Sequence, residues 1–293
     1  MTFKILTDST TDLSEKWAAE HDVTILGLTI QLDGVTYETV GENKLTSKTL
    51  LEKMKAGSQP TTSQINVGQF EDVFREYAKA GTPLLYVAFA SLLSGTYQSA
   101  VMARDIVLED YPQAVIEILE SRAASMGEGL LVMKAVEARS EGKSLTETLN
   151  ILLALRPKVQ TYFLVDDLNH LVRGGRISKT AAMIGSLASI KPIIAVQADG
   201  SLKPIAKVRG KKKAQAECVR MLLENIADGR AVIAHADADQ DAENLKEQLL
   251  ADGRVKEVLI EPLGPVIATH VGPGTLASVS YTHLRAHETK ANL

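Results

Sequence analysis

The chain has few aromatic residues, a single cysteine and no long apolar run. One cysteine, Cys218, excludes an internal disulfide and a metal site built from cysteines. Its place in a helical pattern favours a buried structural thiol. Aromatic residues make up only 4% of the 293 residues, so any large apolar cavity must be lined mostly by aliphatic side chains. No segment approaches the roughly 20 apolar residues of a membrane span, and no signal peptide pattern opens the chain. We therefore expect a cytoplasmic protein.

The charge balance argues against nucleic acid as the main partner. The net charge is −4, and a protein whose main partner is nucleic acid usually has a basic balance. Hydrophobic residues make up 45% and charged residues 23%, as in ordinary globular proteins. A chain of 293 residues is longer than one core usually organises, so two domains are expected.

The first half alternates between strand and helix patterns. Residues 3–7 are expected to form a short buried strand, and the continuous apolar run at residues 84–90 is typical of a central parallel strand. Segments with helical spacing follow each run, and Asp33-Gly34 between two β-rich segments predicts a hairpin. This order predicts an N-terminal α/β domain with a parallel sheet over residues 1–160.

The second half has a mixed pattern. Asp199-Gly200 predicts another hairpin, and two helices and two strands are expected between residues 212 and 260. The expected fold class is therefore α/β with two domains, in which residues 161–278 form a C-terminal α+β domain. Residues 279–293 lose all periodicity and resemble a translated sequencing adapter. We interpret them as a non-native or disordered tail, with the closing strand missing and without a function for the two histidines there.

Three polar loops could form a site. The first is residues 61–64, the second is residues 91–96 between a buried strand and a helix, and the third is residues 269–275. A helix start offers free backbone N–H groups, and ligands of open α/β sheets bind where the strands end. Taken singly, Ser and Thr before a helix are usually caps, and a histidine near Gly-Pro-Gly is usually a turn residue. The prediction of a site depends on the three occurring together.

Several motifs, in this order, resemble those of the DegV family of bacterial fatty-acid-binding proteins. The resemblance covers about residues 3–277. It departs from the family at Ile65-Asn66, where Pro-Ser is common, which leaves the shape of that loop open. The matching motifs are Thr7-Asp8-Ser9-Thr10 with Asp12-Leu13, Thr62-Ser63-Gln64, Ser94-Gly95-Thr96, Arg173-Gly174-Gly175-Arg176-Ile177 and His270-Val271-Gly272-Pro273-Gly274.

The resemblance implies a function and a set of residues. DegV proteins have the two-domain EDD fold and carry one long-chain fatty acid, whose tail lies in a tunnel and whose carboxylate lies near the domain junction. By motif position, Thr62, Ser94 and His270 would hold the carboxylate. The resemblance also implies no catalytic residue, metal or cofactor, and delivery of the acid to a fatty acid kinase for phospholipid synthesis. Supporting residues would be Ser63, Gly95, Thr96, Arg176 and Gly272.

This chemistry suits the residues. A sixteen-carbon tail would contribute roughly 10 kcal/mol gross, at about 0.8 kcal/mol for each buried CH₂, before the cost of association. A buried carboxylate is unfavourable unless it accepts hydrogen bonds. Two hydroxyls, helix-start N–H groups and a histidine supply donors without a fixed counter-ion.

The basic run at residues 207–213 stands out in an acidic protein. Its ordinary interpretation is a solvated helix start, although cations there oppose the helix dipole. The alternative is a docking patch for the kinase, formed by Arg209, Lys211 and Lys212.

Three other functions stay open at this stage. A serine hydrolase could use Ser94 and His270, but Gly-x-Ser-x-Gly and an acidic third member are missing. A phosphate-ligand enzyme could use the helix start, but neither common phosphate-binding glycine motif occurs. A structural protein without a ligand is the third.

Overall fold

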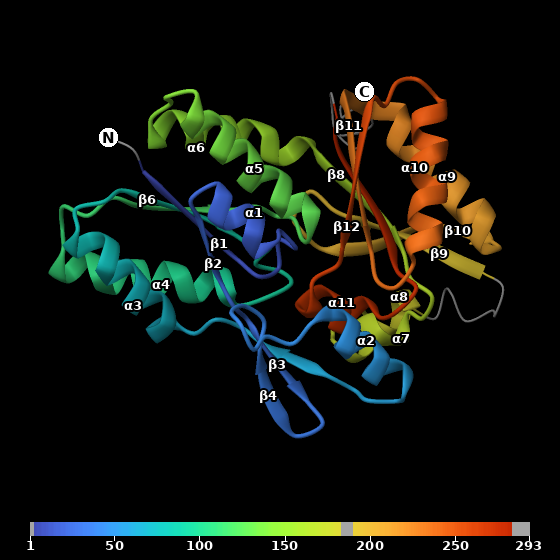
Figure 1. The fold of residues 1–293 in the computed structure, drawn as a ribbon, viewed down its shortest axis with the longest axis horizontal. Coiled ribbons are helices and arrows are strands. Elements are labelled where there is room, and N and C mark those ends of the chain that lie inside the picture. Colours follow the sequence, from blue (N-terminus) through green and yellow to red (C-terminus); the bar gives the residue numbers. More distant parts are fainter. Residues whose placement is uncertain (1–2, 183–189, 283–293) are drawn as a thin grey trace.

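The chain folds around two main sheets, one in each half (Figure 1). The structure is a computed structural model, and it describes residues 3–182 and 190–282. The first sheet has the order β2-β1-β6-β7 and every neighbouring pair is parallel, as predicted. Its strands are β1 (Lys4–Asp8), β2 (Val23–Leu26), β6 (Leu84–Ala88) and β7 (Ile116–Glu120).

Helices cover both faces of this first sheet (Figure 1). Strand β6 shows why: Leu84, Tyr86 and Ala88 pack on one side with helices α3 and α4. Leu85 and Val87 point to the other side, since successive strand residues face opposite ways. The helices are α1 (Glu15–Glu20), α3 (Val67–Lys79), α4 (Thr96–Asp110), α5 (Met126–Ser140) and α6 (Leu145–Leu155).

A small antiparallel sheet with the order β4-β3-β5 projects from the first half. Strands β3 (Thr29–Leu32) and β4 (Val35–Glu38) form the hairpin predicted at Asp33-Gly34. Both turn residues have positive φ, 51° and 82°, as such tight turns require. Strand β5 (Thr61–Ser63) was predicted as a loop; it is a strand because it pairs with β3. Helix α2 (Ser47–Lys55) precedes it.

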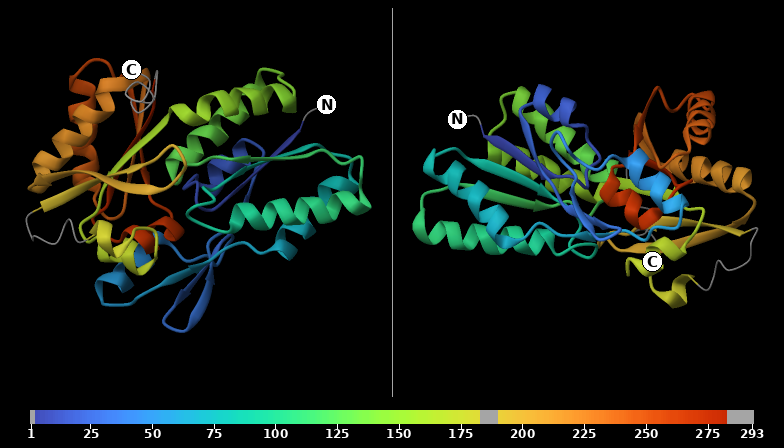
Figure 2. Two further views of the ribbon diagram at one scale, coloured as in Figure 1. Left: turned by 180° about the vertical axis from the view of Figure 1, so that it is seen from behind. Right: turned by 60° about the horizontal axis from the view of Figure 1, so that its bottom comes forward.

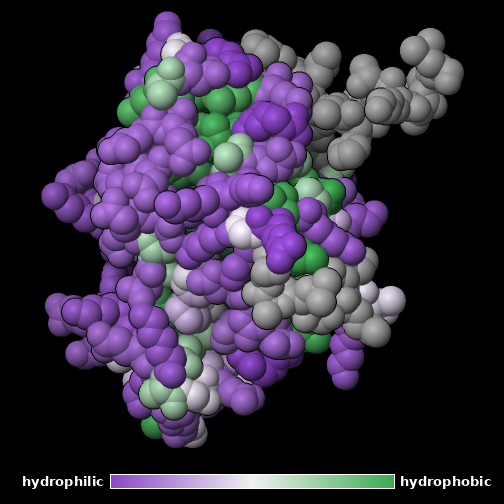
Figure 3. All heavy atoms as spheres, turned by 90° about the vertical axis from the view of Figure 1, so that its right-hand side faces the viewer, coloured by the Kyte–Doolittle hydropathy of each residue, from purple (hydrophilic) through white to green (hydrophobic). Residues whose placement is uncertain are grey.

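The second half is a mixed six-stranded sheet with the order β10-β9-β8-β13-β11-β12. Helices α9 (Lys211–Asn225) and α10 (Asp239–Ala251) cover one face, and their side of the molecule is mainly hydrophilic (Figure 3). The hairpin predicted at Asp199-Gly200 joins β9 to β10. The strands are β8 (Val159–Leu164), β9 (Ile190–Val196), β10 (Leu202–Arg209), β11 (Ile226–His235), β12 (Glu257–Pro262) and β13 (Leu276–Thr282).

The closing strand contradicts one prediction. Strand β13 is present and runs to Thr282, so residues 279–282 are not a disordered tail. It pairs with β8 and β11, and Val279 is fully buried between them. The remainder of the predicted tail, residues 283–293, lies outside the described residues. The domain boundary after residue 160 stays a prediction; β8, which starts at Val159, already belongs to the second sheet.

Short helices gather where the two halves meet (Figures 1 and 2). They are α7 (Asn169–Arg173), α8 (Lys179–Ala182) and α11 (Pro265–Val271), together with α2 from the first half. A 3₁₀ turn, Arg156–Lys158, links the halves. Within residues 3–182 and 190–282, no helix has the length and apolar character needed to cross a bilayer.

Candidate functional site

A cavity with about 930 Å³ of empty space, including its opening, lies between the two halves. Most of its lining is apolar, but polar side chains form part of the wall, and the part around Thr62 and His270 is called the polar end below. Both predicted hydroxyl residues and the predicted histidine line it. The polar lining residues include Thr62, Gln64, Ser94, Arg176 and His270, and the apolar ones include Phe89, Leu93, Phe163, Val196, Leu202 and Val266.

Thr62 and His270 meet directly at the cavity wall. Thr62 Oγ1 and His270 Nε2 lie 2.8 Å apart in a hydrogen bond that joins residues 208 positions apart in sequence. Strand β5 positions Thr62, whose partner in β3 is Ile30. Because strand residues alternate, the neighbouring Ser63 is exposed and does not line the cavity, contrary to its predicted supporting role.

His270 lies in the last turn of helix α11 rather than in the predicted glycine-rich loop. Gly272, with φ of 77°, caps the end of the helix and does not line the cavity. The imidazole packs against Gly174, where an added Cβ would lie 2.3 Å from His270 Nδ1. Burial, together with the positive charge of Arg176, lowers the pKa of His270 to about 4. The ring is therefore neutral near pH 7 and has one N–H to donate.

Ser94 lies in the predicted loop before a helix, and Gly95 is the N-cap of α4. Ser94 Oγ accepts a hydrogen bond from the Thr96 backbone N–H at 3.2 Å and shares another with Thr96 Oγ1 at 2.9 Å. Thr96 is fully buried and does not line the cavity; it holds Ser94 in place. A Cβ at Gly95 would lie 2.2 Å from Gln64 Oε1, so only glycine permits this close packing.

Arg176 brings a positive charge to the polar end. Its Nε donates to the Leu93 carbonyl at 3.0 Å and its Nη1 donates to the Gly174 carbonyl at 2.6 Å. These bonds connect Arg176 to the loop before α4 and to the glycine beside His270. Arg176 thus lies beside His270 in the cavity wall, and its supporting role stays a prediction.

Gln64 was missed as a site residue although it belongs to the Thr-Ser-Gln motif. It lines the cavity, and its Nε2 donates to Ser99 Oγ at 3.0 Å. The apolar lining residues were also missed, because they come from elements whose contact no sequence period reveals. Among them lies Thr161 on β8, whose hydroxyl is buried and has no hydrogen-bond partner within the described residues.

The geometry argues against a serine hydrolase. His270 Nε2 is paired with Thr62, while the hydroxyl of Ser94 is engaged with Thr96. A general base works best with a pKa near the working pH, and that of His270 is about 4.

Within the part of the chain that the structure describes, no group of three or more His, Cys, Asp or Glu residues could hold a metal ion.

The fold and cavity define a two-domain α/β protein with an apolar pocket that is polar at one end. The family model described as "Uncharacterised protein, DegV family" matches residues 2–283, and the chain belongs to the DegV family. A DegV domain-containing protein of Streptococcus pyogenes serotype M1 is 57% identical over 277 residues, covering 94% of this chain and 97% of that protein. One from Lactococcus lactis is 48% identical, with coverage of 96% and 98%.

Solved structures agree with this fold. A DegV family protein from Thermus thermophilus, described as binding fatty acid, has a TM-score of 0.87 and 32% identity, covering 96% of this chain and 100% of that one. The fatty acid binding DegV family protein from Streptococcus agalactiae has a TM-score of 0.84 and 30% identity, covering 95% and 98%.

Proposed function

We propose that this chain binds a long-chain fatty acid in the cavity, with its carboxylate at Thr62, Ser94 and His270. The observation that carries the proposal is the Thr62–His270 hydrogen bond at the polar end of a cavity whose lining is mainly apolar. The relatives support it: besides the two fatty-acid binders above, a protein from Eubacterium ventriosum with 28% identity and a TM-score of 0.83 is described as binding stearic acid.

The hydrogen-bond chemistry fits a carboxylate. If the neutral His270 ring donates its Nε2–H to Thr62 Oγ1, the Thr62 hydroxyl is free to donate its own proton to the ligand. Ser94 adds a second hydroxyl, and Arg176 adds a cation that is already committed to two carbonyls. A carboxylate held mainly by neutral donors is oriented without a dedicated counter-ion, while the tail supplies most of the affinity.

Native mass spectrometry of the purified protein tests this proposal. We expect one fatty acid per chain, and reduced retention in Thr62→Ala and Ser94→Ala. The loss of a hydrogen bond to a charged group corresponds to about 1.5–3 kcal/mol, or roughly 10- to 150-fold in affinity. Ser63→Ala is the matched control, because this neighbouring hydroxyl is exposed and outside the cavity. Protein that carries no lipid and takes up none when supplied would refute the proposal.

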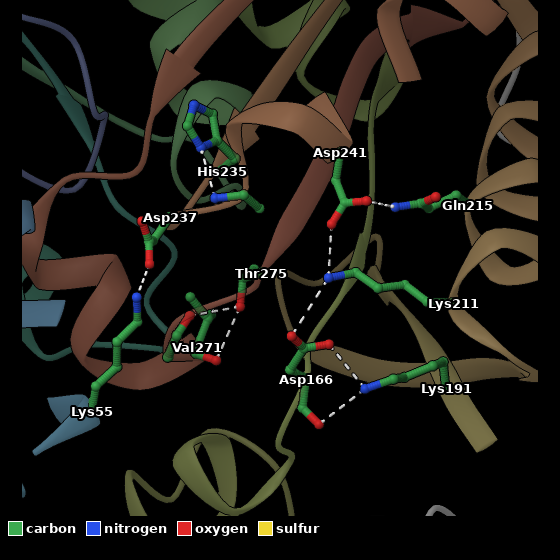
Figure 4. Close-up of polar contacts among 12 residues, drawn as sticks. Lys55, Asp166, Lys191, Lys211, Gln215, His235, Asp237, Asp241, Val271 and Thr275 are labelled. Atoms are coloured by element: carbon green, nitrogen blue, oxygen red, sulfur yellow. Dashed lines mark hydrogen bonds and ion pairs between the residues drawn. The ribbon is translucent and has the colours of Figure 1, made fainter. Parts of the chain in front are cut away.

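We further propose that the chain acts as a carrier and not as an enzyme. In this function it presents the acid to a fatty acid kinase, which forms the acyl-phosphate for phospholipid synthesis. The basic run at residues 207–213, which spans the end of β10 and the start of α9, is the proposed docking patch. Arg209 and Lys212 are exposed and suit this role. Lys211 suits it less, because its Nζ pairs with Asp241 at 2.8 Å and with Asp166 at 3.5 Å (Figure 4).

The docking patch is tested by charge reversal. Arg209→Glu with Lys212→Glu should reduce phosphorylation of the bound acid by a purified kinase while retention of the acid stays the same. Lys211 is left intact, since its reversal would break two ion pairs. Lys16→Glu with Lys143→Glu is the control, because it changes the net charge equally at exposed positions of the first half. Equal phosphorylation of both double variants would exclude the patch.

A further inference from the structure

The turn after β1 contains a partly buried carboxyl group, that of Asp12, which the proposed site does not use. Asp12 lies between the starts of two helices from different halves of the chain. Its Oδ1 accepts a hydrogen bond from the backbone N–H of Gly264, the N-cap of α11, at 2.9 Å. Its Oδ2 accepts a hydrogen bond from the hydroxyl of Ser125, the N-cap of α5. One side chain therefore connects both halves beside the cavity.

The local backbone is arranged around this carboxylate. Asp12 and Ser125 have φ values of 59° and 55°, in the left-handed region that non-glycine residues rarely adopt. Such conformations persist where surrounding contacts fix them, often at functional sites. A Cβ at Gly264 would lie 2.5 Å from Asp12 Oδ1, so α11 can approach this closely only with glycine at its N-cap.

Helix α11 connects the Asp12 contact at its N-terminus to the ligand site at its C-terminus. The helix has seven residues and carries His270 in its last turn. At about 1.5 Å per residue, His270 lies roughly 9 Å along the helix from Gly264. The other end of the same rigid element is therefore where the imidazole meets Thr62 and Gly174. Ser125, the second partner of Asp12, itself lines the cavity.

We propose that Asp12 is a positioning residue: it anchors the N-terminus of α11 and thereby fixes the His270 imidazole against Thr62. Asp12, the second aspartate of the segment at residues 7–12, thus has a role in the geometry of the ligand site without touching the ligand. The consequence for fatty acid binding rests on the proposed function, whereas the placement of His270 does not.

The test measures the environment of His270 directly. The imidazole pKa is followed by NMR on delipidated, histidine-labelled protein, with the His270 signal assigned by its loss in His270→Gln. In the wild type this pKa is about 4 because the ring is buried. In Asp12→Ala we expect it to move back toward 6.5, since α11 is released and the ring gains solvent. Asp12→Asn keeps an acceptor for Gly264 and should keep the pKa low.

Two further variants keep the test decisive. Gly264→Ala removes the close approach from the other side, and should raise the His270 pKa even if Asp12→Ala does not fold. Asp110→Ala, at an exposed aspartate that ends α4 and pairs with Arg75, is the control that should change nothing at His270. A variant that loses thermal stability but keeps the wild-type His270 pKa would show that Asp12 is merely structural and overturn the proposal.

Lipid retention is measured separately in the same variants. A raised His270 pKa together with faster fatty acid loss supports both the positioning role and the proposed function. If the His270 pKa rises in the variants but the wild type binds no fatty acid, the positioning role is supported and only the proposed function is refuted. An unchanged pKa in both Asp12→Ala and Gly264→Ala overturns the positioning role whatever the lipid result.

Discussion

The surroundings of Asp12 also predict how folding stability depends on pH, and this prediction needs no ligand. Burial raises the pKa of this carboxyl from 3.8 to about 7, against the opposing effect of hydrogen bonds from Ser125 and Gly264. The negative charges of Asp8 and Glu261 also contribute to this rise. The folded state therefore holds a proton that the unfolded chain has released. Asp12 contributes stability that is fully present below pH 3.8 and is lost as the pH rises through about 7.

The magnitude follows from the two pKa values. A rise from 3.8 to about 7 corresponds to about 4 kcal/mol, at 1.36 kcal/mol per pKa unit. This is a large share of the 5–15 kcal/mol that typically separates folded from unfolded domains. Asp12→Asn keeps the shape without the charge: its oxygen can accept from Gly264, and its NH₂ group can donate to Ser125. The variant should therefore become more stable than the wild type as the pH rises.

Urea unfolding of both proteins between about pH 4 and about pH 8 measures this difference. Asp8 and Glu128, whose pKa values are also raised by burial, lower stability with rising pH in the same direction. Both remain in the variant, but each interacts electrostatically with Asp12, so the difference between the two curves reports Asp12 together with its coupling to these two carboxyls. We expect the curves to diverge with rising pH by up to about 4 kcal/mol and then run parallel. Curves that are parallel throughout would refute the assignment of a protonated Asp12 in the folded state.

Further predictions concern single buried groups. Thr161→Val should raise the unfolding free energy by about 1–3 kcal/mol in urea titrations, because it removes a buried hydroxyl that has no partner among residues 3–182 and 190–282. Thr148→Val, at a similar hydroxyl on α6 outside the cavity, should do the same without changing fatty acid retention. Gly95→Ala should displace Gln64 and lower the unfolding free energy by about 1–3 kcal/mol in the same titrations. Burial raises the pKa of Cys218 to about 12, so its thiol should react with a thiol reagent only after unfolding.

Patterns among neighbouring residues predicted several main strands, turns and helix starts. The apolar run that became β6 is buried on both faces by helices, which is why its sequence is continuous and not alternating. The Asp33-Gly34 hairpin needed two positive φ values, and those residue types tolerate them. Ser94 lies before α4 as predicted, because a strand, a short polar loop and a helix follow one another directly. These features depend only on neighbours in sequence.

Other elements depend on distant partners, and local patterns missed them. Strand β5 has three polar residues and exists because β3 pairs with it. Residues 279–282 look irregular until β8 and β11 lie on either side of them. Helix α11 is a different case, since Pro265 at its first turn and Gly272 just past its end are recognised helix boundary signals. The glycine-rich appearance of the segment after His270 obscured them.

The meeting of Thr62 and His270 lies beyond any local pattern, because 208 positions separate them in sequence. Each was predicted as a site residue through a family motif, but their direct hydrogen bond depends on how the two halves pack. That packing also favours anion binding over the serine hydrolase that the sequence left open. A histidine meant to activate Ser94 would need to face it and to hold a proton near neutral pH. His270 instead faces Thr62, and burial keeps its ring neutral. A neutral ring that orients a hydroxyl suits holding an anion better than starting a reaction on it.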